Sequence, residues 1–119
     1  MHALIIEDEA LIAVTIEDAL RDCGCSSFDF AVSVEAAVEA ARRHCPDIIT
    51  ADVRLAPGCG IDAVEAICAN RAIPVIFITG TADGVKERFP QHAIVHKPFN
   101  AAHVVAAVQL VTGQQPKVA

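Results

Sequence analysis

The chain has 119 residues, enough for one domain of ordinary size and short for two. Hydrophobic residues make up 54% of the sequence and charged residues 20%, a balance that excludes an intrinsically disordered chain. Fifteen acidic against nine basic residues give a formal net charge of −6, and tryptophan and tyrosine are absent. The basic surface and stacking aromatics of nucleic-acid-binding proteins are therefore missing, so no nucleic-acid partner is expected.

The apolar segments of the sequence are all short. None approaches the roughly 18 consecutive apolar residues of a membrane-spanning helix. The N-terminus runs directly into Leu4, Ile5 and Ile6 and then into acidic residues, unlike a signal peptide. We therefore expect a cytoplasmic protein without a membrane partner. It should form a single domain over residues 1–119, with a short polar tail over residues 114–119.

Five cysteines, an odd number without a Cys-x-x-Cys pair, argue against a disulfide framework and fit a reducing cytosol. Cys23 and Cys25 with His44 and Cys45 could be imagined as a zinc site, but their spacing matches no common ligand pattern. Cys23, Cys45 and Cys68 extend the apolar faces of expected helices, so packing is the favoured interpretation. The scattered histidines are expected at solvated or capping positions; they are His2, His44, His92, His96 and His103.

The first half of the chain alternates short apolar runs with helical patterns. It predicts a strand, a helix, a strand and a helix, over residues 3–6, 12–23, 28–32 and 34–45 respectively. In the first helix, apolar residues recur at helical spacing from Ile12 to Cys23, and Gly24 suits its end. Ser33 is a suitable N-cap for the second helix, which Pro46 closes.

The second half continues the alternation. The expected strands cover residues 48–51, 74–79 and 94–96, and the expected helices cover residues 61–68, 82–89 and 100–111. The fourth strand is apolar throughout, which is typical of a strand buried on both faces. The fourth helix is weakly supported, because it holds Gly84 and meets Pro90. Asn100 caps the last helix and Gly113 ends it.

Five strand–helix repeats with short connections predict an α/β fold, a parallel sheet with helices on both faces. In such a sheet, ligands bind outside the carboxyl ends of the strands. The first strand is followed by Glu7 and Asp8, the third leads into Asp52, the fourth ends at Thr79, and Lys97 comes after the fifth. We therefore expect three carboxylates, a hydroxyl and an ammonium group along one edge.

This set of side chains favours phosphoryl chemistry. Clustered carboxylates raise one another's pKa unless a cation lies among them, and Mg²⁺ prefers one or two carboxylates together with water and phosphate oxygens. A carboxylate left facing substrate can attack phosphorus and form an aspartyl phosphate. The threonine and the lysine would then supply donors to the transferred group.

Four segments resemble the response-regulator receiver domain of two-component signalling. They are Leu4-Ile5-Ile6-Glu7-Asp8-Glu9, Ile48-Ile49-Thr50-Ala51-Asp52-Val53-Arg54-Leu55, Pro74-Val75-Ile76-Phe77-Ile78-Thr79-Gly80 and His96-Lys97-Pro98-Phe99. The match extends over roughly residues 2–113, and its motifs are specific in this order and spacing. The resemblance implies a flavodoxin-like (βα)5 sandwich with strand order 2-1-3-4-5.

The resemblance also implies a metal site around the phosphoacceptor. It makes Asp52 the acceptor and assigns Glu7 and Asp8 to Mg²⁺, Asp8 as a direct ligand and Glu7 through water. The backbone carbonyl of Arg54 would complete that site.

On the phosphate side, the resemblance makes Thr79 the switch hydroxyl and Lys97 the partner of the phosphate, and it implies a cis peptide bond before Pro98. Two positions depart from the family pattern. Ile94 stands where the family has its switch aromatic, so the usual threonine–aromatic coupling is not expected. Gly80 replaces the common alanine and would open access to the phosphoryl group.

The implied function is a phosphoacceptor, not an enzyme beyond weak self-phosphorylation and self-dephosphorylation. A histidine kinase or histidine phosphotransfer protein would donate the phosphate, and a separate protein would receive the signal. The surface of the fourth helix, fifth strand and fifth helix would bind that partner or a second copy of the chain. Two alternatives stay open: a phosphorylation-independent adaptor, and a small Mg²⁺-dependent aspartyl phosphohydrolase. The second would require an acid at the position of Arg54.

Overall fold

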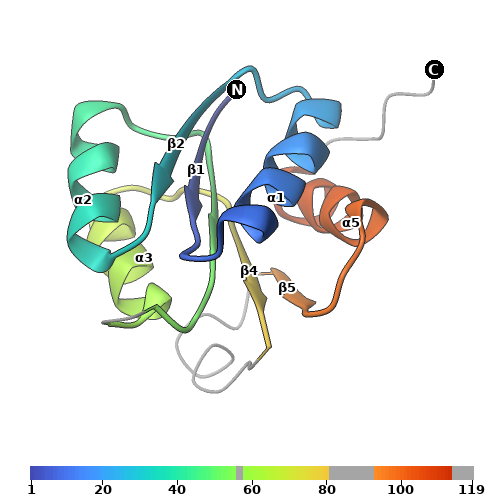
Figure 1. Cartoon of the computed structure of the whole chain (residues 1–119). Helices are drawn as coiled ribbons and strands as arrows, with labels where there is room; N and C mark the ends of the chain where they lie inside the picture. Colours follow the sequence, from blue (N-terminus) through green and yellow to red (C-terminus); the bar gives the residue numbers. More distant parts are fainter. Residues whose placement is uncertain (56–57, 81–92, 114–119) are drawn as a thin grey trace.

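A computed structural model describes residues 1–55, 58–80 and 93–113 of the protein (Figure 1). Five parallel strands form one sheet in the order β2-β1-β3-β4-β5. They are β1 (His2–Ile6), β2 (Ser27–Ala31), β3 (Ile48–Ala51), β4 (Val75–Thr79) and β5 (Ala93–His96). This order confirms the predicted flavodoxin-like fold. The first two strands each begin one residue earlier than the sequence pattern predicts.

Helices cover both faces of the sheet (Figure 1). They are α1 (Ala10–Asp22), α2 (Val34–Arg43), α3 (Gly60–Cys68) and α5 (Ala101–Thr112). Helices α2 and α3 pack on one face, and α1 and α5 pack on the other. The helix predicted over residues 82–89 and the tail predicted over residues 114–119 lie outside the described residues.

Two helix starts follow the expected capping chemistry. The Ser33 hydroxyl accepts a hydrogen bond from the Ala36 N–H at 3.1 Å at the start of α2. At α5, the side chain of Asn100 accepts from the His103 N–H at 3.1 Å, and His103 Nδ1 accepts from the Asn100 N–H at 3.2 Å. His103 is therefore a capping histidine, as predicted. Gly113 ends α5 with a φ of 70°.

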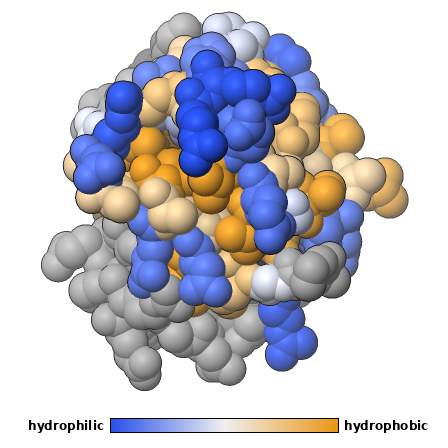
Figure 2. All heavy atoms as spheres, turned by 90° about the vertical axis from the view of Figure 1, so that its left-hand side faces the viewer, coloured by the Kyte–Doolittle hydropathy of each residue, from blue (hydrophilic) through white to orange (hydrophobic). Residues whose placement is uncertain are grey.

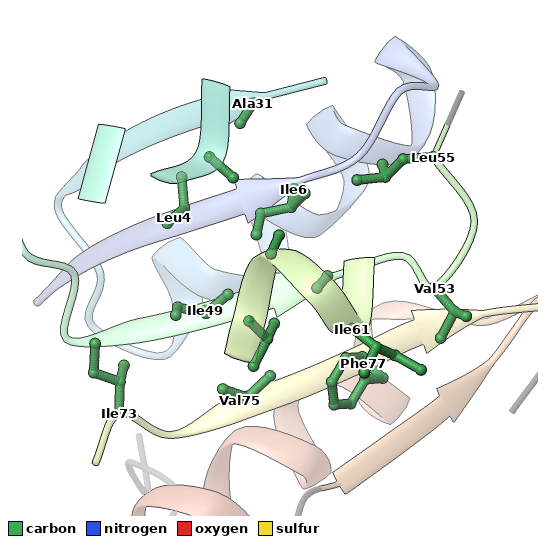
Figure 3. Close-up of a cluster of buried hydrophobic side chains, with 14 of the residues drawn as sticks. Leu4, Ile6, Ala31, Ile49, Val53, Leu55, Ile61, Ile73, Val75 and Phe77 are labelled. Atoms are coloured by element: carbon green, nitrogen blue, oxygen red, sulfur yellow. The ribbon is translucent and has the colours of Figure 1, made fainter. Parts of the chain in front are cut away.

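The core consists of two clusters separated by the sheet. Successive residues of a strand point to opposite faces, so Leu4 and Ile6 belong to the cluster under α2 and α3, and Ile5 belongs to the other. Figure 3 shows the first cluster, in which Phe77 of β4 lies close to Ile61 of α3. The central strands are thus buried on both faces, which explains why they are continuously apolar.

The cysteines are packing residues, as the sequence predicts. Cys45 and Cys68 pack against the first cluster and Cys23 against the second, while Cys25 is itself part of the second. All five thiols are free. Burial raises the pKa of the Cys23, Cys25 and Cys68 thiols, which keeps them protonated and weakly reactive at neutral pH.

The prediction that the histidines are solvated or capping is wrong for His2. Its side chain is buried, because it lies at the amino end of β1 between neighbouring segments. One ring nitrogen contacts Ser27 and the other contacts Asp29, at 2.7 Å and 2.9 Å. The ring of His44 stacks on it at a centroid distance of 3.6 Å.

Figure 2 views the face formed by α2 and α3, where hydrophobic side chains (orange) lie between hydrophilic ones (blue). Several large apolar side chains elsewhere are also exposed, among them Leu11 and Val14 of α1 and Leu110 of α5. Within the described part of the chain, no helix combines the length and apolarity needed to cross a membrane.

Candidate functional site

The carboxyl ends of β1, β3, β4 and β5 meet along one edge of the sheet. In the register, Ile6 is paired with Ala51, Ala51 with Phe77, and Thr79 with His96. The residues that follow these strands are consequently brought together although they are far apart in the sequence. This edge holds the side chains singled out by the sequence.

Three carboxylates form the acidic part of the site. One oxygen each from Glu7, Asp8 and Asp52 lies within 4.8 Å of the other two. Glu7 is 3% exposed and Asp52 7%, whereas Asp8 is exposed. The site therefore has a buried floor and one carboxylate at its opening.

Lys97 connects two of these carboxylates. Its Nζ atom lies 2.9 Å from Asp52 Oδ2 and 3.1 Å from Glu7 Oε1. The backbone N–H of Lys97 donates to the carbonyl of Thr79 at 2.9 Å, which ties the end of β5 to the end of β4. The ammonium group is thereby held beside the Asp52 carboxylate.

Backbone donors fix the remaining carboxylate oxygens. Asp52 Oδ1 accepts a hydrogen bond from the Arg54 N–H at 3.1 Å, and Glu7 Oε2 accepts one from the Glu9 N–H at 3.2 Å. The Asp52 N–H itself donates to the Ile6 carbonyl at 2.9 Å. Both carboxylates are thus oriented by the loops that carry them.

The environment of the site shifts the pKa values of Glu7 and Lys97 for different reasons. Burial raises the pKa of Glu7, and the neighbouring charge of Asp52 adds to this, while Lys97 opposes it. Burial lowers the pKa of Lys97, but its close pairing with the carboxylates of Asp52 and Glu7 outweighs that effect, so its pKa lies above the ordinary value. Glu7 and Asp52 thus share one ammonium group that stays charged at neutral pH, and Asp8 adds a third carboxylate nearby.

The donor set fits a hard divalent cation such as Mg²⁺. Glu7 Oε1 is buried and has no aligned hydrogen-bond donor among the described residues, although Lys97 Nζ lies at ion-pair distance. The exposed carboxylate of Asp8 and the buried one of Asp52 offer further oxygens. Oxygen ligands from one or two carboxylates, with water completing the shell, are the ligands that Mg²⁺ prefers.

Gly60, the first residue of α3, is a positioning residue that the sequence did not single out. Its N–H donates to the Val53 carbonyl at 2.8 Å, and a Cβ atom here would lie 1.8 Å from the carbonyl oxygen of Asp52. Only glycine allows α3 to start this close to the loop that carries Asp52. This close approach between two segments exists only in the folded chain, so no local sequence pattern reveals it.

The other predicted residues surround this centre. Thr79 is buried at the end of β4, and Gly80 after it is exposed. Ile94 is partly buried and packs against the first core cluster. The peptide bond between Lys97 and Pro98 is cis. Residues 81–92, which follow Gly80 and contain the predicted fourth helix, lie outside the described residues.

Comparisons with known proteins agree on one family. The sequence model of the response regulator receiver domain matches residues 3–109. The transcriptional regulatory protein PdtaR of Mycobacterium tuberculosis is 32% identical over 117 residues, which cover 95% of this chain and 57% of that protein. This chain therefore spans little more than half of that relative.

Solved structures show the same likeness. The solution structure of the PhyR response regulator REC domain of Erythrobacter litoralis is 34% identical, has a TM-score of 0.81, and is matched over 99% of this chain and 94% of its own. The receiver domain of sensor histidine kinase PA1611 from Pseudomonas aeruginosa, solved with magnesium coordinated in its active site cleft, is 28% identical. Its TM-score is 0.77, with 95% of this chain and 98% of that one covered. The chain belongs to the response regulator receiver domain family.

Proposed function

We propose that this receiver domain accepts a phosphoryl group on Asp52 in a Mg²⁺-dependent reaction. The observation that carries the proposal is the position of Lys97 Nζ, 2.9 Å from Asp52 Oδ2, beside three clustered carboxylates. A nucleophilic carboxylate, an acidic metal site and a fixed cation are the groups that phosphoryl transfer requires. Residues 1–119 would act as one receiver domain with its core in residues 2–113.

The reaction consists of one substitution at phosphorus. A carboxylate oxygen of Asp52 attacks the phosphorus of a phosphohistidine, the P–N bond breaks, and its electron pair stays on the imidazole nitrogen, which takes up a proton. Bound Mg²⁺, held by Asp8, Asp52, the Arg54 carbonyl and Glu7 through water, would neutralise charge between the carboxylates and the phosphoryl oxygens. Lys97 and Thr79 would then hold the transferred group.

The donor is proposed to be a histidine kinase or a histidine phosphotransfer protein. Two apolar side chains at the start of α1, Leu11 at 85% exposure and Val14 at 52%, lie on the helix that follows Glu7 and Asp8 directly. An apolar patch beside an acidic opening suits a protein donor better than a small phosphoester. The proposed role is accordingly signalling, with little turnover of small substrates.

The signal would leave through a second surface on the described part of β5 and α5. A hollow of about 490 Å³ lies there, lined among others by Ile94, His96, His103 and Leu110. It adjoins Lys97 along the chain, so a changed contact of this lysine would reach it. A separate output protein, or a second copy of the chain, is the proposed occupant.

A cytoplasmic location completes the proposal. All five cysteine thiols are free in the folded protein. Proteins with several unpaired thiols are typical of reducing compartments such as the cytosol. The proposed phosphodonor protein would have to be in the same compartment.

The test is phosphorylation with acetyl phosphate, read by intact mass. With Mg²⁺, the wild-type chain should gain one phosphoryl group, and with EDTA it should not. Asp52→Asn removes the nucleophile and should gain none, whereas the control Asp18→Asn, an exposed position on α1, should behave as the wild type.

Two results would contradict the proposal. A wild-type chain that gains no phosphoryl group from acetyl phosphate or from a kinase panel would favour the phosphorylation-independent adaptor. Continued release of inorganic phosphate from small phosphoesters would favour the phosphohydrolase, although Arg54, an exposed base, stands where that chemistry requires an acid.

A further inference from the structure

A second group of metal-ligating side chains lies at the opposite edge of the sheet. His2 at the start of β1, Asp29 of β2 and His44 just after α2 each place one nitrogen or oxygen within 4.8 Å of the other two. None of these residues contributes to the phosphoacceptor site. The sequence gives no spacing motif for them, because three separate segments supply them.

His2 is held in place from two sides. Its Nδ1 atom lies 2.7 Å from Ser27 Oγ, and its Nε2 atom lies 2.9 Å from Asp29 Oδ2. Its backbone N–H donates to Asp47 Oδ2 at 2.7 Å, and its carbonyl accepts from the Asp47 N–H at 2.7 Å. These contacts fix the imidazole and bring the segment after α2, which carries His44, next to β1.

The contact between His2 and Asp29 has two chemical explanations. A carboxylate accepts but does not donate, so Nε2 either carries a proton or shares a cation with Asp29. Ser27 can serve both cases, because its hydroxyl donates to Nδ1 in the first and accepts from Nδ1–H in the second. In the second case Ser27 orients the ring from behind, as the outer hydrogen-bond partners of metal-bound histidines do.

His44 is the third side chain of the group, and its exposure leaves the group accessible to an ion from solvent. It stacks on His2 with an angle of 7° between the rings and is exposed, and Asp29 is only partly buried. Ligand atoms of a tetrahedral zinc site lie roughly 3.4 Å apart, given bonds of about 2.1 Å. The ligand atoms here lie within 4.8 Å of one another, with 2.9 Å between His2 Nε2 and Asp29 Oδ2, so rotation of the more exposed side chains of Asp29 and His44 brings them to that spacing.

We propose that His2, Asp29 and His44 bind a divalent transition metal, with Zn²⁺ as the fitting ion and water as the fourth ligand. Two imidazoles and one carboxylate are a donor set for Zn²⁺ and its neighbours in the first transition row, in contrast to the all-oxygen site at the other edge. The bound ion joins β1, edge strand β2 and the end of α2, so it stabilises the fold.

The test uses the tag-free chain carrying Asp8→Asn and Asp52→Asn, which remove two of the three carboxylates of the acidic edge and so suppress metal binding there. Zn²⁺ is titrated calorimetrically in excess Mg²⁺, and thermal unfolding is followed by circular dichroism. We expect one Zn²⁺ per chain and a rise in Tm of roughly 5 °C at saturation. His44→Gln, at an exposed position, should weaken binding at least about tenfold and abolish the rise in Tm.

His96→Gln is the matched control, because His96 is exposed and lies at the other end of the sheet; it should bind Zn²⁺ unchanged. Asp29→Asn provides a second variant that keeps shape and should also weaken binding. Absence of Zn²⁺ binding to the Asp8→Asn/Asp52→Asn chain, or equal binding after His44→Gln, as thiol ligation would give, overturns the proposal. Phosphorylation of Asp52 is a separate measurement, so either proposal can fail alone.

Discussion

At the scale of single residues, Glu7 and Lys97 set the charge of the acidic edge around Asp52. Lys97 stays protonated because Asp52 and Glu7 hold its ammonium group, and this offsets the cost of its own burial. Glu7 is the group whose charge is least well compensated, since its Oε1 atom is buried without an aligned donor among the described residues. If the site binds a cation as proposed, it should destabilise the fold when that cation is absent.

This imbalance predicts that Glu7→Gln stabilises the metal-free protein. Because the pKa of Glu7 is raised above its ordinary 4.5, the folded state binds this proton more tightly than the unfolded chain does. The stability linked to this group is present in full below pH 4.5 and is lost as pH rises through the folded-state pKa. In EDTA, Tm of the variant should exceed that of the wild type at neutral pH.

The difference between the two Tm values should vanish as pH falls below 4.5, where Glu7 is protonated in both states. Glu35→Gln, at an exposed position of α2, is the control and should change stability by less than about 0.5 kcal/mol. Thermal unfolding followed by circular dichroism across this pH range gives the answer. A Glu7→Gln chain that is less stable than wild type at neutral pH would contradict the interpretation of Glu7.

At the scale of elements, the start of α3 fixes the loop that carries Asp52. Its first residue, Gly60, touches the backbone of Asp52 and donates to Val53, so helix and loop form one unit. Nearby, Gly58 has a φ of 108°, a conformation that side chains with a Cβ rarely adopt. The two glycines set the path of the chain between β3 and α3.

Gly60→Ala should accordingly lower the free energy of unfolding by about 1–3 kcal/mol or more, because the new methyl group meets rigid backbone. Phosphorylation of Asp52 should slow as well, since the acceptor loop has to shift. Gly80→Ala is the control for stability, because a Cβ there meets nothing within 4 Å among the described residues. Urea unfolding followed by far-ultraviolet circular dichroism measures the stability of both variants. Equal stability of the two variants would contradict this account.

At the scale of the whole molecule, one sheet serves two cores. Strand β1 lies between β2 and β3 and contributes Leu4 to the cluster under α2 and α3 and Ile5 to the cluster under α1 and α5. A destabilising substitution on either face therefore affects a strand that both clusters share. The two clusters are expected to unfold together.

Leu4→Ala and Ile5→Ala should each reduce the free energy of unfolding by about 2–5 kcal/mol, as other buried aliphatic truncations do. The chain has no tryptophan or tyrosine, so methyl NMR is the suitable probe. Val75 reports on the first cluster and Val104 on the second. In urea, both signals should disappear at the same midpoint in each variant; separate midpoints would show that the cores unfold independently.

The sequence predicts the features that are determined by residues close to one another along the chain, such as strands and helix caps. Alternating apolar runs located the strands, and because parallel strands end at one edge, Asp52 and Lys97 were expected to meet. Their 2.9 Å contact in the fold follows that logic. Cap positions such as Ser33 were equally local, since the side chain contacts a backbone group three residues away.

Features that depend on packing between distant segments were not predictable. His2 and His44 stack only because the sheet places β1 beside the end of α2, and no spacing rule relates residues so far apart. The close approach of Gly60 to Asp52 is of the same kind. The apolar pattern also misplaced the start of β1, because His2, a polar residue, pairs with Ser27 in the sheet.

Strand β1 separates the acidic edge from the histidine cluster by its whole length. It has 5 residues, with His2 at one end and Glu7 following the other. A strand of this length spans roughly 17 Å, about twice the distance over which salt at physiological strength screens a charge. Salt screens exposed charges over such a distance, but His2, Glu7 and Asp52 are buried, and buried charges are screened much less. A cation bound at one end of β1 would therefore act on the charges at the other end through the interior of the sheet.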